Sequence, residues 1–235
     1  MSAKYREVSQ ILEMKIYEGE FPYSTKLPTE DEMIETFGVS RNTVRKAVEI
    51  LVQKGLVMPV QGSGIFVRWT SDQGITSLEG FQGMTLGFSR SNIRSEVVEF
   101  ELIEADEEIA KNMNCEIGTP VYYIERVRHL DGKPYVYEYS YYNKNVIPYL
   151  SVEIISKSIY SYITRDLNKQ LGYVHRVIYA DKLTKKQAEY FGLEEGDPAL
   201  ITTNTAMLKS GVVFDYSVDV HHYQNTKFLK LSNIM

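Results

Sequence analysis

The N-terminal part of the chain carries the hydrophobic pattern of short amphipathic helices. Between Lys4 and Glu18, apolar residues recur at spacings of three and four, which predicts a helix with one buried face that ends at Gly19. The residues expected on its buried face are Tyr5, Val8, Ile11, Leu12 and Ile16. Such a helix would pack across the back of the helices that follow it.

Two more helices are predicted directly after it. Thr29 and Glu32 have the spacing of a capping box, in which a hydroxyl and a carboxylate satisfy backbone N–H groups at a helix start. This helix ends at Gly38, since glycine tolerates the left-handed conformation of a C-cap. The residues it buries are Met33, Ile34 and Phe37. Ser40 can cap the next helix, which ends at Gly55 and buries one apolar stripe. That stripe comprises Val44, Ala47, Val48, Leu51 and Val52.

A hairpin is predicted after the third helix. The β-prone runs Leu56 to Val60 and Ile65 to Arg68 flank the sequence Gln61-Gly62-Ser63-Gly64, and a glycine-containing turn between such runs is typical of a hairpin. Glycines there let the backbone approach a sugar-phosphate chain, because no Cβ intervenes. Two helices joined by a short turn and followed by this hairpin predict a winged helix-turn-helix over residues 1–68.

The rest of the chain is patterned for strands and contains an internal repeat. From about Leu78, alternating aromatic-rich runs are separated by turn signals. Residues 106–142 resemble residues 185–223, with an offset of 78 before the hairpin turn and 77 after it. The matched positions are Gly118 with Gly196, Pro120 with Pro198, and Tyr137–Ser140 with Phe214–Ser217.

Each copy predicts a short helix, a Gly-x-Pro corner and two strands joined by a turn at Asp131-Gly132 or Ser210-Gly211. Two such copies would form one antiparallel sheet with pseudo-two-fold symmetry and helices packed on it, an α+β architecture with a cleft between its halves. A helical stretch, Ser158 to Leu171, lies between the copies. We interpret the polar segment of residues 69–77 as a linker, which leaves residues 78–235 as the second domain.

Composition indicates a soluble globular protein. Its 235 residues are 43% hydrophobic and 24% charged, and no apolar run approaches the roughly 18 residues of a membrane span. The N-terminus lacks the apolar core of a signal peptide, so a cytoplasmic location is expected. The single cysteine, Cys115, excludes an internal disulfide, and the four histidines lack metal-binding spacing. Without a nucleophile elbow, a phosphate-cradling loop or a dinucleotide fingerprint, we predict no catalytic residue and no cofactor.

The exposed face of the third predicted helix has the chemistry of a nucleic-acid surface. In its first turn and a half, side chains can reach base edges and backbone N–H groups can point at phosphates. The residues there are Arg41, Asn42, Thr43, Arg45 and Lys46. The net charge is −5, yet residues 41–68 hold five basic residues and one acid, and the local field steers a protein to phosphate. A helix-turn-helix can also be a packing unit with a solvated basic face, but cap, turn, basic helix and glycine hairpin together favour DNA binding.

The two copies of the repeat differ at a pair of arginines. Arg126 and Arg128 lie two residues apart on one strand, hence on one face, and neutral residues match them in the other copy. Guanidinium groups bind phosphate or carboxylate bidentately, while Glu138 and Asp215, at equivalent positions of the copies, suit hydroxyls or an amine. This combination indicates a sugar phosphate. The alternative is that the arginines are surface charges on an edge strand, paired with Glu125 or Glu138.

The motifs LPTEDE, VSRNTVRKAVEIL, GLV and QGSGIFV resemble the winged helix-turn-helix of GntR-type bacterial transcription regulators, over roughly Tyr5 to Val67. The resemblance implies that the start of the third helix and the turn of the wing contact DNA. The predicted DNA-contacting residues are Ser40, Arg41, Asn42, Thr43, Arg45, Gln61, Gly62 and Gly64. The chain departs from the family at Asp31, where arginine is frequent and touches DNA, so that contact is not carried over.

Residues Leu78 to Phe228 resemble the effector-binding domain of the HutC subfamily of these regulators, which is similar in fold to chorismate lyase. The resemblance implies that an R-x-R pair and a serine of an S-I-Y stretch bind the phosphate of a sugar phosphate, while acidic residues hold its hydroxyls. The implied effector-binding residues are Arg126, Arg128, Glu138, Ser158, Tyr160, Asp215, His221 and Phe81. Glu79-Gly80 replaces a small hydroxylated pair before Phe81, and His221 replaces a tyrosine, which indicates a different sugar.

These observations predict a homodimeric, ligand-responsive repressor of sugar-uptake or sugar-metabolism genes. A two-fold dimer matches a palindromic operator in double-stranded DNA, and a phosphorylated sugar that binds one arrangement of the dimer better would shift the spacing of its recognition helices. One alternative is the same regulator tuned to a carboxylate or amine metabolite. The other is a chorismate-lyase-like enzyme tethered to DNA, for which the sequence names no poised acid.

Overall fold

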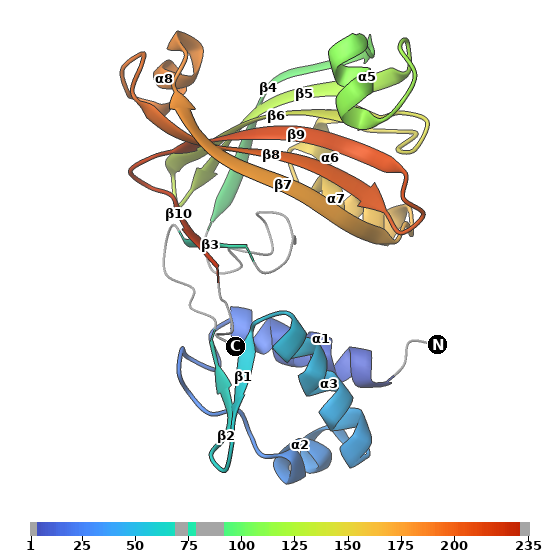
Figure 1. Cartoon of the computed structure of the whole chain (residues 1–235), viewed down its shortest axis with the longest axis vertical. Coiled ribbons are helices and arrows are strands. Elements are labelled where there is room, and N and C mark those ends of the chain that lie inside the picture. Colours follow the sequence, from blue (N-terminus) through green and yellow to red (C-terminus); the bar gives the residue numbers. More distant parts are fainter. Residues whose placement is uncertain (1–3, 69–74, 79–91, 231–235) are drawn as a thin grey trace. The chain divides into compact units, whose positions relative to one another are not determined.

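The computed structural model describes residues 4–68, 75–78 and 92–230. The chain divides into two compact units, one formed by Met1–Arg90 with Lys227–Met235 and the other by Ser91–Thr226 (Figure 1). Among the described residues, no helix combines the length and the apolar character needed to cross a membrane.

The first unit contains the predicted helix-turn-helix and wing. Its helices are α1 (Lys4–Tyr17), α2 (Glu30–Phe37) and α3 (Arg41–Gln53), and its hairpin pairs β1 (Val57–Val60) with β2 (Gly64–Val67). Thr29 and Glu32 form the predicted capping box of α2, and Gly38 ends that helix in the left-handed conformation with φ 59°. Ser40 caps α3 by accepting a hydrogen bond from the N–H of Thr43. These local signals were therefore predicted correctly.

The three helices and the wing enclose one hydrophobic core. Val8, Leu12 and Ile16 of α1 are buried there with the apolar stripe of α3 and with Leu56 of the segment before β1. Ile11 was predicted to be buried, but 38% of its surface is exposed. The buried face of α1 is centred on three residues spaced by four, and Ile11 lies on its flank.

Part of the segment predicted as a linker forms a short strand. β3 (Ile75–Ser77) lies in the segment predicted as linker, residues 69–77, and pairs in parallel with β10 (Lys227–Leu229) near the C-terminus. Residues 69–74 of that linker lie outside the described residues. Because β10 joins β3, the C-terminal segment belongs to the first unit, whereas the sequence placed residues 78–235 in one domain.

The second unit is built on a six-stranded antiparallel sheet whose order reflects the internal repeat. The order is β4-β5-β6-β9-β8-β7, so β6 and β9 form the centre and the two copies of the repeat supply the four inner strands (Figure 1). The strands are β4 (Ile93–Glu104), β5 (Pro120–Leu130), β6 (Lys133–Asn143), β7 (Leu171–Lys182), β8 (Pro198–Leu208) and β9 (Val213–His222). Ser140 and Ser217, equivalent in the two copies, face each other across the central pair, so the pseudo-two-fold axis passes between them.

Both faces of this sheet are partly covered by helices (Figure 1). The repeated helices α5 (Glu107–Met113) and α8 (Lys185–Phe191) pack on one face. On the other face lie α6 (Val152–Ile155), α7 (Ile159–Ser161) and the π-helical turn η1 (Tyr162–Asp166). The helical stretch predicted for Ser158 to Leu171 therefore ends early, because Asn168 turns left-handed at φ 48° and Leu171 already begins β7.

Candidate nucleic-acid interface and effector site

The predicted DNA-contacting residues gather at the start of α3 and at the turn of the wing. Ser40, Arg41, Asn42 and Arg45 are exposed there, and Thr43 is half-buried. The wing turn is exposed at Gln61 and Gly62, and Gly64 is half-buried.

Both wing glycines hold conformations that other residues rarely adopt. Gly62 has φ 74° and Gly64 has φ 122°. A Cβ at Gly64 would lie 2.3 Å from Cε of Lys26, so the flexible end of that side chain would have to move aside. The backbone conformation at Gly64 therefore favours glycine by itself, in addition to any approach to DNA.

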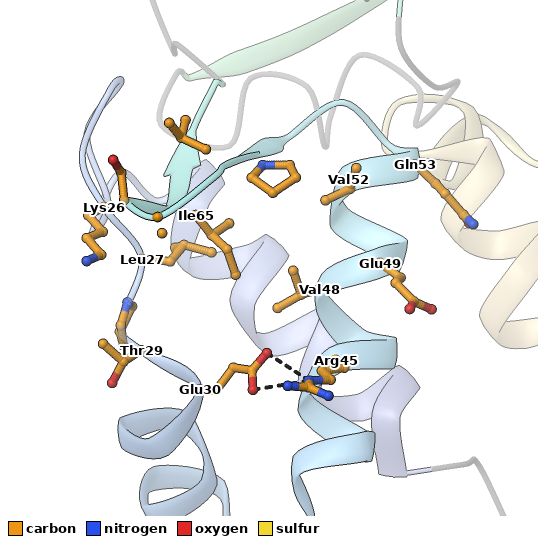
Figure 2. Close-up of a pocket in the computed structure, with 16 residues that line it drawn as sticks. Lys26, Leu27, Thr29, Glu30, Arg45, Val48, Glu49, Val52, Gln53 and Ile65 are labelled. Atoms are coloured by element: carbon orange, nitrogen blue, oxygen red, sulfur yellow. Dashed lines mark hydrogen bonds and ion pairs between the residues drawn. The ribbon is translucent and has the colours of Figure 1, made fainter.

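A groove of about 790 Å³ separates α3 from the wing (Figure 2). Its wall on α3 includes Val48 and Val52, and the wing contributes Ile65. Arg45 and Glu30 lie together at one end of this groove, where the start of α2 approaches α3 (Figure 2). The cationic end of the recognition helix thus borders a partly apolar hollow that leads to the wing.

The two arginines of α3 pair with acids at the start of α2. Arg45 donates from Nε to both carboxylate oxygens of Glu30, at 2.9 and 3.1 Å (Figure 2). Arg41 donates from Nη2 to Oδ1 of Asp31 at 2.5 Å, and its Nη1 lies 3.9 Å from Glu30. The hydrogen bond that Arg45 donates to Glu30 raises the pKa of Arg45. Sequence reasoning missed these pairs, because they depend on how α2 and α3 pack.

In the second unit, Arg126 and Glu138 form a buried pair on the sheet face that α6 and α7 cover. Arg126 donates from Nε and Nη2 to Oε1 of Glu138, at 3.0 and 2.6 Å, and from Nη1 to the carbonyl of Ile155 at 2.6 Å. Burial by itself would raise the pKa of Glu138, but Arg126 and Arg128 outweigh burial and lower it. The arginine therefore holds an ionised carboxylate and anchors the end of α6 to the sheet.

Arg128 lies on the same face of β5, two residues further along the strand. It is buried, and its Nη1 lies 3.9 Å from Oε2 of Glu138. Burial, and then the neighbouring charge of Arg126, lower its pKa to about 10. The arginines are thus neither exposed nor on an edge strand, so the alternative of surface charges is wrong in both respects, but the pairing with Glu138 that it named is present.

The carboxyl group of Asp215 on this face lacks a hydrogen bond from any described residue at one of its two oxygens. It is 1% exposed, accepts at Oδ2 from the hydroxyl of Tyr160 at 2.6 Å, and has no hydrogen-bond partner for Oδ1 among the described residues. Burial raises its pKa well above the ordinary value. A buried polar atom without a partner is uncommon, so this oxygen suits a group brought by a ligand.

The remaining predicted effector residues have different surroundings. The hydroxyl of Ser158 accepts from the N–H of Ser161 at 3.3 Å as the N-cap of α7. His221 is buried with Nε2 3.2 Å from the hydroxyl of Thr202, and burial lowers its pKa to about 3, so it is neutral. Phe81, with Glu79-Gly80 before it, lies outside the described residues.

Sequence reasoning missed a polar network in the second half of this face. Arg176 donates to Oδ1 of Asn204 at 2.7 Å, and Asn204 donates to Oδ2 of Asp219 at 2.9 Å. Asp219 also accepts from Thr202 at 3.0 Å and faces Glu138 across the central strand pair, and burial raises its pKa to about 6. The repeat offered a signal, since Asn204 is the counterpart of Arg126.

Comparison with known proteins gives two family matches and several full-length relatives. Residues 4–67 match the bacterial regulatory proteins of the gntR family, and residues 89–227 match the UTRA domain. The HTH-type transcriptional regulator YydK of Bacillus subtilis is 35% identical over 98% of this chain and 98% of its own. Its crystal structure superposes with a TM-score of 0.83, covering 98% of this chain and 100% of that one.

Two further relatives are named as repressors. The HTH-type transcriptional repressor NagR of Bacillus subtilis is 28% identical over 96% of this chain and 93% of its own. The mannosyl-D-glycerate transport/metabolism system repressor MngR of Escherichia coli is 27% identical over 95% of this chain and 93% of its own. Both alignments span the helix-turn-helix and the sheet unit together.

Proposed function

The chain belongs to the gntR family of bacterial regulatory proteins and carries a UTRA domain, and from this membership we propose that it represses sugar-uptake or sugar-metabolism genes until a phosphorylated sugar binds. A DNA-binding transcription regulator, and not an enzyme, is what the family and its relatives have in common. The name of MngR, a repressor of a mannosyl-D-glycerate system, supports a sugar-related target.

The DNA-binding side of the proposal rests on α3 and the wing. Arg41 and Arg45 lie exposed in the first turns of α3, where a recognition helix meets base edges in the major groove. The wing turn presents Gly62 on the opposite side of the groove that lies between α3 and the hairpin. Each chain carries one such surface, so we propose that a homodimer presents two of them to a palindromic operator.

The effector side rests on the unpartnered Oδ1 of Asp215. A ligand hydroxyl would supply the missing hydrogen bond, and Asp215 lies on the same sheet face as Arg126. Arg126 has five N–H groups, of which three point at Glu138 and Ile155, so each terminal nitrogen keeps one N–H for an anion. We assign the phosphate to Arg126 and Arg128, and the hydroxyls to Glu138 and Asp215.

Thermal-shift measurements with phosphorylated sugars, and with organic acids of equal charge, test this assignment. A ligand at a hundred times its dissociation constant stabilises the folded protein by about 2.7 kcal/mol. We expect phosphorylated sugars to stabilise, and to release a DNA fragment taken from upstream of the protein's own gene in gel shifts. If organic acids stabilise the protein and phosphorylated sugars do not, the effector is a carboxylate and not a sugar phosphate.

Arg128→Gln separates the effector site from the DNA surface. It removes a charge that we assign to phosphate binding while leaving α3 and the wing unchanged. We expect the variant to bind the same DNA fragment as the wild type but to require at least about tenfold more ligand for release, as loss of one charge-assisted contact implies. A normal response to ligand would place the anion elsewhere.

A further inference from the structure

The two arginines of the recognition helix are held through different atoms. Glu30 contacts Arg45 at Nε, and no described residue pairs with the terminal nitrogens of Arg45. Asp31 contacts Arg41 at Nη2, and Glu30 approaches the Nη1 of Arg41 at 3.9 Å. An arginine grips a phosphate or a guanine through its terminal nitrogens. Arg45 is therefore held in a way that leaves its terminal nitrogens available, whereas one terminal nitrogen of Arg41 already binds a carboxylate.

We propose that Asp31 is an intramolecular competitor of DNA phosphate at Arg41, and that it sets the strength and the salt dependence of operator binding. The carboxylate of Asp31 occupies the position at Nη2 that a phosphate oxygen would take. DNA must displace it before Arg41 can contribute its charge. The inference depends on DNA binding and is independent of which effector the second unit senses.

The geometry of α2 explains why Asp31 faces α3. Thr29 fixes the helix start, so Glu30, Asp31 and Glu32 occupy its first turn. Glu32 turns back to the N–H of Thr29 at 2.7 Å and is used within α2. The other two acids remain for the arginines of α3.

The exposure of the pair makes it exchangeable. The side chains of Arg41 and Asp31 are 54% and 78% exposed, and an ion pair at such a site contributes little stability because water and salt screen it. A phosphate, whose field adds to that of the whole duplex, can therefore displace the carboxylate. Asp31 would then be left beside the backbone of the DNA, where like charges repel.

This exchange has a signature in the salt dependence. An arginine that neutralises a phosphate releases a condensed cation, and each such contact steepens the plot of log affinity against log salt by about 0.9. When Arg41 leaves Asp31, the freed carboxylate attracts a cation again and offsets that release. The wild-type plot is therefore shallower than the number of its phosphate contacts implies.

Asp31→Asn tests the inference, with Glu35→Gln as the matched control. Both changes remove one negative charge from α2, but Glu35 is exposed and has no ion pair among the described residues. Fluorescence anisotropy would measure affinity for the fragment upstream of the protein's own gene, over a series of salt concentrations. We expect D31N to bind roughly three- to tenfold more tightly at low salt with a slope steeper by about one, and E35Q to stay within about twofold of the wild type.

The Arg41→Gln background shows whether the effect passes through Arg41. In that background D31N should change neither affinity nor slope, because no guanidinium remains to be released. A gain that persists in R41Q, an equal gain in E35Q, or a loss of affinity in D31N would each overturn the inference. Thermal unfolding of every variant verifies that α2 is intact, and failure of the wild type itself to bind any duplex would count against DNA binding rather than against the role of Asp31.

Discussion

The two units of this protein use the same type of ion pair in opposite environments. At the start of α3, the side chains of Arg41 and Arg45 remain 54% and 58% exposed although both are paired with acids. On the sheet, the side chains of Arg126 and Glu138 are 4% and 10% exposed. The first kind of pair exchanges its partner readily, whereas separating the second leaves buried charges that cost several kcal/mol.

The difference teaches how each unit meets its ligand. The proposed DNA surface keeps its arginines in contact with water, so a phosphate could replace a carboxylate there without any change in the fold. The sheet instead fixes its charges in one arrangement, and a ligand at the proposed effector site would have to offer contacts to groups such as Asp215. A ligand that makes such contacts better in one conformation than in another shifts the protein toward that conformation.

Breaking the buried pair should have the largest effect. Glu138→Gln leaves Arg126 charged in a buried site without the carboxylate that pairs with it, and such losses cost about 3 to 5 kcal/mol. We expect chemical denaturation to show this loss in the free energy of unfolding. Glu153→Gln is the control, because it removes an exposed pair with Lys157 and should leave the denaturation midpoint unchanged. Equal behaviour of the two variants would mean that burial does not distinguish the pairs.

The pH dependence of stability sharpens the comparison, because Asp219 titrates within the buried network. Burial raises its folded pKa to about 6 from 3.8, so the folded protein binds the proton more readily than the unfolded chain. The resulting stabilisation is complete below pH 3.8 and is lost as the pH rises through 6. Since one pKa unit corresponds to about 1.4 kcal/mol, the loss is about 3 kcal/mol at most.

Asp219→Asn removes this contribution. We expect the free energy of unfolding of the wild type, relative to that of the variant, to fall between pH 4 and pH 6 in urea titrations. His221 acts in the opposite direction, because burial lowers its pKa to about 3 and its contribution is lost as the pH falls below about 6.5. It is present in both proteins and cancels in the difference. Parallel pH profiles would show that the pKa of Asp219 is not raised in the folded state.

Removing an exposed arginine should have the smallest effect on the fold and a clear effect on DNA. Arg45→Ala deletes a side chain that is 58% exposed, so we expect an unchanged thermal midpoint and unchanged stabilisation by ligand. Binding to the fragment upstream of the gene should weaken by about tenfold or more, as loss of a base contact implies. Lys46→Ala is the control at the next position. We expect it to lower the affinity for all duplex sequences equally. A lowered midpoint in R45A would make Arg45 a structural residue.

Local sequence signals located most of the elements. Thr29, Gly38 and Ser40 act through hydrogen bonds and backbone conformations within a few residues, so helix starts and ends were readable. The repeat located the hairpins β5–β6 and β8–β9, because its offset changes at the hairpin turn. The edge strands β4 and β7 lie outside the repeat, and neither was predicted individually.

The partners within the candidate site could not be predicted, because they depend on register. A plain two-residue hairpin at Asp131-Gly132 would place Tyr137 opposite Arg126. A bulge between Arg128 and His129 shifts the register by one, and Glu138 faces Arg126 instead. The second copy has the equivalent irregularity between Ala206 and Met207. The pairs of Arg41 and Arg45 likewise depend on packing between helices that the sequence does not encode locally.

The face-to-face serines at the centre of the sheet also bear on how such a site can change. If two identical hairpins were paired about that axis, every chemical group would occur twice, once in each half of the sheet. Fusion into one chain lifts that restriction, so Arg126 can stand in one half while Asn204 stands in the other. A molecule with dissimilar ends then has a single preferred orientation, and mutations in either half can retune one end without disturbing the other.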